Sequence, residues 1–402
     1  GEVTMRAGLD TRESGAWHEQ RDSGVGAMDT FSWGTAQQKA NSSQTQQSAR
    51  ASAAGSLQGN VTITAGGTYR QEGSDLVALE GDIDVEARRI EVVEARETER
   101  NTSHTETRST GLGVSAGQPL LDAARTAGRM ASAAGNTSDP RLQALALATT
   151  GLAVANAVDA LQDPGAYGGA SVDLRLGTSK SSSDSTWSSD QATASSINAK
   201  GSVRLKATGG GNESDIVLQG VQLRAGADVG LEADDDVHLL VARNTREQHS
   251  QNKSSGASVG VNFGAEKDGV GFAITGSLQA ARGQADGHDV TWTNTQIDAG
   301  GTFTLKTGGD TQMKGATVNA NRIDAQIEGD LLIVSLQDTS QYDSKQRNAG
   351  VNGSFGLGTR ASSGSASVGG SDIHSTYASV NDQSGLFAGD RGFGGGVYRT
   401  TT

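Results

Sequence analysis

The six histidines of this 402-residue chain are the side chains best suited to acid–base or metal chemistry. They are scattered along the sequence, and none has the spacing that places two ligands on one face of a helix. We therefore interpret them as exposed polar residues on hairpins and loops. The six are His18, His104, His238, His249, His288 and His374.

A run of three acidic residues, Asp234 to Asp236, could bind a hard cation through its carboxylate oxygens. No loop of spaced acidic residues and glycine accompanies the run, so a solvated corner between two strands explains it better. The Glu and Arg residues between positions 91 and 108 indicate a charged outer face rather than paired catalytic carboxylates. The sequence thus predicts no catalytic, cofactor-binding or metal residue, although a lyase site built from ionisable residues on adjacent coils stays open.

Two tryptophans, Trp187 and Trp292, follow a threonine at matching positions in two repeats. The favoured interpretation is that they pack the base of a hairpin against the body of the protein. The alternative is a surface contact, in which the rings stack on a sugar or bind a receptor.

The composition favours an elongated fold with a thin core. The chain contains 56 Gly, 3 Pro and no Cys, and only 34% of its residues are hydrophobic. This hydrophobic fraction is low for a thick globular core and too high for a disordered chain.

The net charge of −13 argues against nucleic acid as a partner, because an acidic surface repels phosphate. The lack of cysteine excludes disulfides and thiolate metal sites.

One strand pattern recurs three times, at 61–67, 203–209 and 303–309. Apolar and polar residues alternate in each copy, and small residues with glycine close it, which is typical of a half-buried strand followed by a turn. Further short strands follow at spacings of about 20 residues, which suits three strands of about 5 residues with short turns. The sequence therefore predicts an all-β fold: a parallel β-helix, or β-solenoid.

A second pattern marks where the chain leaves this rod. Each of four motifs opens a Ser-, Gln- and Asn-rich stretch that later returns: Asp10-Thr11, Glu97-Thr98, Asn244-Thr245 and Asp338-Thr339. We interpret these stretches as long β-hairpins. The third has its turn at Lys267–Gly269, since alternating apolar residues lead up to it and away from it. In the second, Leu112 and Val114 are expected to pair with Val172, Leu174 and Leu176.

One Ala- and Leu-rich segment breaks the β pattern and predicts a small helical hairpin. Asp139 is a suitable N-cap, and Pro140 occupies the first helical position. Residues 142–158 contain no charged residue. We expect these helices to pack on each other or on the rod; the alternative is insertion into a target membrane. The candidate membrane contacts are Leu147, Val154, Val158 and Leu161.

These patterns divide the chain into eight parts. The parts are the end of a preceding repeat with its hairpin (1–54), coils with an outgoing strand (55–116), the helical hairpin (117–165), a returning strand (166–195), coils (196–243), a long hairpin (244–295), coils (296–337), and a C-terminal hairpin with its return (338–402). Residue 1 begins inside a strand pattern and no signal peptide is recognisable, so we expect an internal segment of a longer chain.

Several motifs resemble the haemagglutinin-repeat region of two-partner-secreted exoproteins, the filamentous haemagglutinin and CdiA contact-dependent growth inhibition family. The motifs are Trp292–Gly300, Leu305–Asp310, Lys314–Ala316, Ser335–Thr339, Tyr342–Arg347, Tyr377–Val380 and Gln383–Gly385. The resemblance covers nearly the whole chain except the helical segment. It implies a right-handed β-helix that is exported to the bacterial surface through an outer-membrane transporter of the CdiB type.

The resemblance also implies a function without catalysis and without a cofactor. In one hypothesis the chain belongs to a growth-inhibition effector and helps deliver a C-terminal toxin, which an immunity protein binds, across the outer membrane of a target cell. In the other it is the shaft of a filamentous adhesin that binds cell surfaces.

Overall fold

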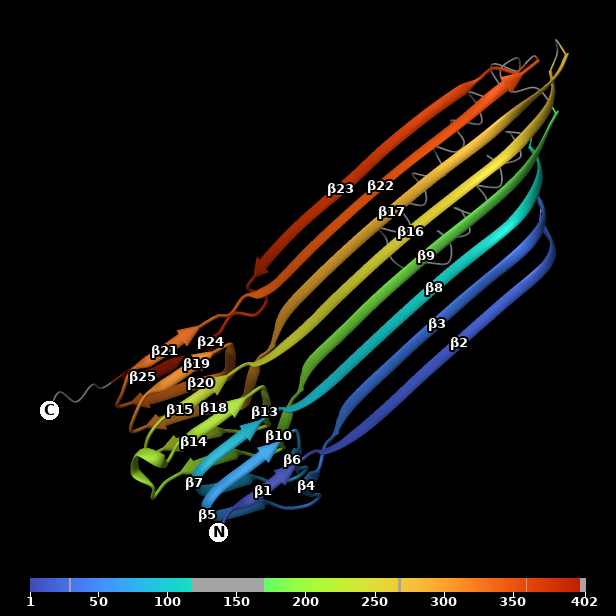
Figure 1. The fold of residues 1–402 in the computed structure, drawn as a ribbon. Helices are drawn as coiled ribbons and strands as arrows, with labels where there is room; N and C mark the ends of the chain where they lie inside the picture. Colours follow the sequence, from blue (N-terminus) through green and yellow to red (C-terminus); the bar gives the residue numbers. More distant parts are fainter. Residues whose placement is uncertain (29, 118–169, 267–268, 359, 398–402) are drawn as a thin grey trace.

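The computed structural model describes residues 1–28, 30–117, 170–266, 269–358 and 360–397. The chain forms a rod of short parallel strands, from one side of which long antiparallel strands extend (Figure 1). The parallel part is a β-helix, as the repeats predict. The predicted helical hairpin lies outside the described residues. Within the described ranges we find no helix of the length and apolarity that crossing a membrane requires.

Each coil of the rod has three strands, and strands of one kind pair in parallel from coil to coil to form three faces. The first face contains β4 (Ala53–Ser56), β6 (Asp75–Ala78), β10 (Ser195–Ala199), β13 (Val221–Ala225), the starts of β18 (Thr295–Thr307) and β20 (Ala316–Ile327), and β24 (Gly385–Ala388). The second contains the starts of β5 (Val61–Glu72) and β7 (Ile83–Val93), β11 (Val203–Ala207), β14 (Val229–Ala233), the ends of β18 and β20, and β25 (Phe393–Val397). The third contains β1 (Val3–Arg6), the ends of β5 and β7, β12 (Ile216–Gln219), β15 (Val237–Leu240), β19 (Thr311–Lys314) and β21 (Leu331–Val334).

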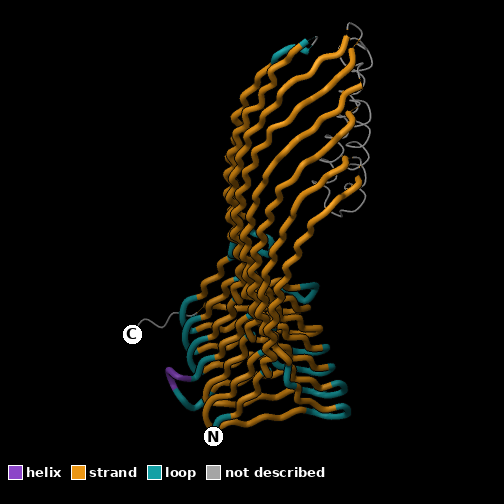
Figure 2. Tube along the Cα trace, turned by 45° about the vertical axis from the view of Figure 1, so that its right-hand side comes forward, coloured by secondary structure: helices purple, strands orange, loops and turns teal. Residues whose placement is uncertain are grey.

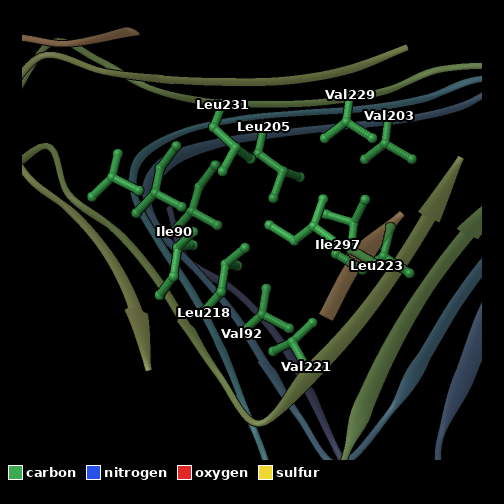
Figure 3. Close-up of a cluster of buried hydrophobic side chains, with 14 of the residues drawn as sticks. Ile90, Val92, Val203, Leu205, Leu218, Val221, Leu223, Val229, Leu231 and Ile297 are labelled. Atoms are coloured by element: carbon green, nitrogen blue, oxygen red, sulfur yellow. The ribbon is translucent and has the colours of Figure 1, made fainter. Parts of the chain in front are cut away.

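The core of the rod consists of columns of apolar side chains, one from each coil. On the second face Ile83, Val203, Val229, Phe303 and Ile323 are paired in sequence, and each is at most 1% exposed. Figure 3 shows such neighbours, with Val203 beside Val229. Burying one such side chain contributes about 1.5–3 kcal/mol, and only stacking of coils buries it.

The four hairpins form one continuous antiparallel sheet, which we call the hairpin sheet (Figure 2). Its strands, in spatial order, are β2 (Gly8–Met28), β3 (Thr30–Arg50), β8 (Ala95–Gly117), β9 (Ala170–Thr193), β16 (Ala242–Glu266), β17 (Gly269–Thr293), β22 (Asp338–Leu357) and β23 (Ser363–Ser379). The alternating patterns predict each hairpin singly, and the pairing of one hairpin with the next emerges only in the structure.

The predicted pairing inside two hairpins is confirmed. Strand β16 ends at Glu266 and β17 begins at Gly269, so the chain reverses where the pattern places the turn. In the second hairpin Leu112 lies opposite Leu176.

A simple rule connects rod and sheet: every hairpin leaves after a third-face strand and returns to the first face, and two coils separate consecutive hairpins. Neighbouring strands lie about 4.8 Å apart, so two coils advance by about 9.6 Å. A hairpin has two strands and occupies the same width. Consecutive hairpins therefore meet at hydrogen-bonding distance.

A glycine allows the chain to pass this corner in the coils that carry no hairpin. Gly73, Gly220 and Gly315 each connect the third face to the first, with φ of 55°, 59° and 62°. L-residues disfavour this left-handed conformation. Each glycine also lies beneath the base of a hairpin: a Cβ at Gly220 would be 2.8 Å from the Cβ of Ala242, the first residue of β16.

We expect Gly220→Ala to lower the free energy of unfolding by about 1–3 kcal/mol, because the left-handed φ and the contact with Ala242 both oppose a Cβ. Urea denaturation followed by circular dichroism measures the change. The control is Gly230→Ala, since a Cβ there meets its nearest atom, Cγ of Arg204, at 3.9 Å. Equal denaturation midpoints for the two variants would contradict the role of the corner.

The two-coil rule predicts which deletions the fold tolerates. Removing residues 194–293 deletes two coils and the third hairpin. We expect β9 then to pair with β22 in one sheet, with Asp190 opposite Thr339. In the intact chain Asp190 faces Thr245, Thr245 faces Val290 and Val290 faces Thr339, so both residues belong to one row. Cysteines at these two positions should then form a disulfide in the otherwise cysteine-free chain. Removing the single coil 221–241 brings the third hairpin about 4.8 Å too close to the second, and we expect a loss of cooperative unfolding. Similar behaviour of both deletions would refute the rule.

Candidate functional surface: the hairpin sheet

A hydroxyl group closes the base of each hairpin. At the third hairpin the Thr295 hydroxyl donates to the carbonyl of Leu240 at 2.6 Å and accepts the backbone N–H of Val221 at 3.2 Å. Its side chain is fully buried. The same contact, from a returning residue to the carbonyl that precedes the outgoing strand, occurs at the other three hairpins: Ser52 to Arg6, Ser195 to Val93 and Ser384 to Val334, at 2.5–2.7 Å.

One row of residues crosses the hairpin sheet just above this base. The threonines of the four exit motifs all lie in it, one on each outgoing strand. From β2 to β23 the row is Thr11, Gln47, Thr98, Asp190, Thr245, Val290, Thr339 and Ala378. We call it the threonine row. It fixes the register of every row farther from the rod.

The distal half of the sheet presents a broad apolar surface on one face. Directly opposed residues share a face, and residues two apart along a strand do so too. The apolar residues of six strands satisfy both conditions, and we call them the apolar band: Trp33, Leu112, Leu174, Leu176, Val259, Val261, Phe263, Phe272, Ile274, Leu278, Val351, Phe355 and Leu357. Most are exposed, for example Trp33 by 62%, Leu278 by 63% and Phe355 by 61%.

Contacts within the apolar band are lateral, between neighbouring strands. The rings of Phe263 and Phe272 lie 6.2 Å apart, tilted by 35°. A hollow of about 520 Å³ opens where Leu176, Val259 and Leu278 surround Gly276. Monomeric proteins rarely expose so many contiguous apolar side chains unless the surface binds a partner or a membrane.

The opposite face of the same strands carries small and polar residues. Gly111, Gly177, Ser258 and Ser277 form one row of it, and the hydroxyls of Ser258 and Ser277 are 2.6 Å apart. A groove of about 1260 Å³ runs along these rows. The distal sheet is therefore amphipathic.

The two tryptophans singled out from the sequence lie near the base of the sheet, not in the apolar band. Both are partly buried. The indole N–H of Trp292 donates to the carbonyl of Gln337 at 2.9 Å, just before β22 begins. The guanidinium carbon of Arg246 lies 5.9 Å from the ring centre of Trp187. The Trp292 indole thus contacts the segment that joins rod strand β21 to β22, and the Trp187 ring lies beside Arg246 of β16. The candidate membrane contacts Leu147, Val154, Val158 and Leu161 lie outside the described residues.

Five of the six histidines lie in the hairpin sheet, and four of these lie opposite a carboxylate on the neighbouring strand. The fifth, His18 on β2, lies opposite Ala40, and His238 lies on the rod strand β15. Nδ1 of His104 is 2.5 Å from Asp184, and Nδ1 of His374 is 2.6 Å from Asp343; both pairs are exposed. His249 pairs with Asp286, whose pKa the contact with His249 lowers. His288 lies opposite Glu247 at 3.5 Å. Each pair joins two strands of one hairpin, as expected for polar residues on hairpins.

The acidic run lies at a corner of the rod, where Asp234 accepts the N–H of Gly209 in the preceding coil and Asp236 accepts an N–H of the next coil. Oδ1 of Asp236 accepts the N–H of Asp310 at 2.6 Å, and Oδ1 of Asp310 accepts that of Asp330 at 2.8 Å. Within the described ranges, Asp215, Asp235 and Asp236 form the one group of three metal-type ligands, with oxygens within 4.8 Å. Burial, then the charges of Asp236 and Asp215, raise the pKa of Asp235. Asp236 and Asp310 thus each join two neighbouring coils through a backbone N–H.

Several Glu and Arg residues between positions 91 and 108 form ion pairs. Glu91 accepts from Arg70 at 2.6 Å and from Arg89 at 2.8 Å, and Arg108 binds Glu106 at 2.7 Å. These arginines lower the pKa of Glu106 and, against the effect of burial, that of Glu91. The pattern is that of a charged outer face.

Comparison with known proteins identifies the repeat. A family model described as "Hemagglutinin repeat" matches residues 32–145 and 176–349, which is most of the chain. The chain belongs to the haemagglutinin-repeat family. The matched ranges include both the coils of the rod and most of the hairpin sheet.

Curated relatives with this repeat are much longer proteins. The chain is 38% identical over 358 residues (87% of the chain, 11% of the relative) to the "tRNA nuclease CdiA" of Escherichia coli (strain NC101). It is 34% identical over 398 residues (97% and 12%) to the "Deoxyribonuclease CdiA" of Dickeya dadantii, and 35% identical over 403 residues (97% and 12%) to the "Toxin CdiA" of Yersinia pestis. No solved structure gives a significant match. The chain thus corresponds to about one-ninth of each of these relatives.

We expect Thr295→Val to lower the free energy of unfolding by about 1–3 kcal/mol. Valine keeps the shape of threonine but removes the hydroxyl that accepts the buried N–H of Val221 and donates to the partly buried carbonyl of Leu240. Urea denaturation measures the loss. Thr304→Val, on the outward side of the same strand, is the control and should change stability by less than about 0.5 kcal/mol. A loss of the same size in the control would show that the hydroxyl contact has no special role.

Proposed function

We propose that this chain is a non-catalytic segment of a secreted contact-dependent growth-inhibition exoprotein. In this proposal its hairpin sheet helps carry a C-terminal toxin across the outer membrane of a target cell. In this proposal the rod winds as a right-handed β-helix, and the small helical hairpin that the sequence predicts at 117–165 is inserted after β8, which ends at Gly117. The nuclease activities that the relatives' names state belong to those proteins, and in this proposal the toxin is a separate part of the exoprotein.

The partners follow from the family. A CdiB-type outer-membrane transporter exports the exoprotein to the bacterial surface, and an immunity protein binds the toxin in the producing cell. The target-cell surface or outer membrane is the partner of the segment itself. The net charge of −13 disfavours nucleic acid as a ligand of this segment.

The observation that carries the proposal is the exposed apolar band. From Leu278 to Phe272 it extends about 20 Å along β17, and it crosses six of the eight strands. Apolar side chains on one face and small polar residues on the other suit a sheet that meets lipid on one side only. In the adhesin alternative the same band would bind a partner on the cell surface, and the experiment below separates the two functions.

Charges in the apolar band test the proposal. In an exoprotein that carries this segment and a toxin, we expect Leu278→Asp with Phe355→Asp to reduce killing of target cells at least about 10-fold, because a buried aspartate in lipid is unfavourable. Display on the producing cell, measured by antibody labelling, should stay unchanged. Killing assays against cells without the immunity protein give the effect.

The matched control is Gln279→Asp with Asn352→Asp. These residues lie on the same two strands, are also exposed, and point to the opposite face. We expect them to preserve killing. Equal killing by both double variants would overturn the proposed role of the apolar band. Loss of binding to target cells together with killing would instead favour the adhesin.

A further inference from the structure

The hairpin sheet has two outer strands, β2 and β23, and each leaves one edge of backbone N–H and carbonyl groups without a strand partner in the described part of the chain. Inside the sheet the same junction between hairpins occurs three times. A returning strand receives the outgoing strand of the next hairpin, in the pairs β3–β8, β9–β16 and β17–β22. Strand β23 is a returning strand of this kind, and β2 is an outgoing one.

The three junctions share one register. In each, the threonine of an exit motif lies opposite a fixed residue of the preceding hairpin: Thr98 opposite Gln47, Thr245 opposite Asp190, and Thr339 opposite Val290. Because Ala378 lies opposite Thr339, it is the next member of the threonine row. Thr11 begins the row on β2.

A side-chain contact strengthens two of the junctions. The side chain of the residue before the exit-motif threonine accepts a backbone N–H of the preceding hairpin. That N–H belongs to the residue two positions after the one that lies opposite the threonine. Oε1 of Glu97 accepts the N–H of Ala49 at 2.9 Å, and Oδ1 of Asn244 accepts that of Ala192 at 2.7 Å. Asp10 holds the equivalent place before Thr11.

The composition of β23 differs from that of a protected edge strand. Proteins guard exposed edge strands with charges, proline or bulges. Its 17 residues contain one Asp and one His, with no Lys, Arg or Pro. Val368 is 88% exposed and Tyr377 55%. Strand β2, in contrast, carries charges of both signs along its length.

We propose that the free edge of β23 is a docking edge for the outgoing strand of another hairpin of this same repeat. The threonine of that hairpin's exit motif lies opposite Ala378, and the acidic residue before it accepts the N–H of Val380. The hairpin sheet is thus an extensible surface that grows by two strands for every two coils of rod. Docking continues an interface that the chain already uses three times.

A tandem protein tests the docking register. Six rod strands, or two coils, separate consecutive hairpins. A direct fusion of two chains would supply three, namely β24, β25 and the β1 of the second copy. The two full chains are therefore joined by a copy of residues 68–87, which contains one strand of each face and so supplies the missing coil. We expect Ala378→Cys in the first copy and Thr11→Cys in the second to form a disulfide on oxidation, because opposed residues of an antiparallel pair lie within disulfide range. The cross-link is read as altered mobility on non-reducing gels.

Two controls use the cysteine-free background. Gln47→Cys with Thr98→Cys, an observed pair, should cross-link in the same tandem protein. Ala378→Cys with Gln20→Cys should not, since Gln20 lies nine residues, about 30 Å, from Thr11. If the observed pair cross-links and the Ala378–Thr11 pair does not, the proposal is wrong.

A second measurement does not depend on the fusion. Separately purified full chains with Thr11→Cys and Ala378→Cys are mixed at high concentration and oxidised, beside a mixture of the Gln20→Cys and Ala378→Cys chains. Docking in the proposed register predicts at least about 10-fold faster formation of the first mixed dimer. Equal rates for the two mixtures, including no dimer in either, would overturn the proposal.

Discussion

The distance between neighbouring β-strands governs this structure. The coils of the rod and the strands of the hairpin sheet both repeat every 4.8 Å or so, because both are joined by backbone hydrogen bonds. A hairpin after every second coil is therefore the arrangement in which rod and sheet advance at the same rate. The glycine corners at Gly73, Gly220 and Gly315 belong to the same constraint, since they let the intervening coil turn tightly beneath the next hairpin.

The rod and the hairpin sheet differ in how much of their surface is buried. The rod buries most of its inward side chains, and only at its ends are such residues exposed, for example Ile333 by 40% and Phe393 by 56%. The hairpin sheet has no second layer within the described residues, so both of its faces stay open. Its lower half is polar and its distal half is apolar on one face. The rod thus holds an amphipathic sheet at a distance from its own axis.

Most of the residues that first suggested chemistry have structural partners. Histidines of the sheet join strands through carboxylates, and corner aspartates accept backbone N–H groups from coil to coil. These contacts recur with the repeat, which a catalytic site would not require.

The sequence by itself determined the parallel β-helix, the places where each hairpin leaves, and the pairing inside the third hairpin, because alternation and turns are local signals. It did not reveal that the hairpins join, since pairing between Asp190 and Thr245 depends on the rise of two coils and not on any nearby residue. For the same reason Leu112, Val259 and Phe355 were recognisable as strand residues but not as one surface. Only the tertiary structure places them on a common face, because rows across the sheet connect positions that are far apart in the chain.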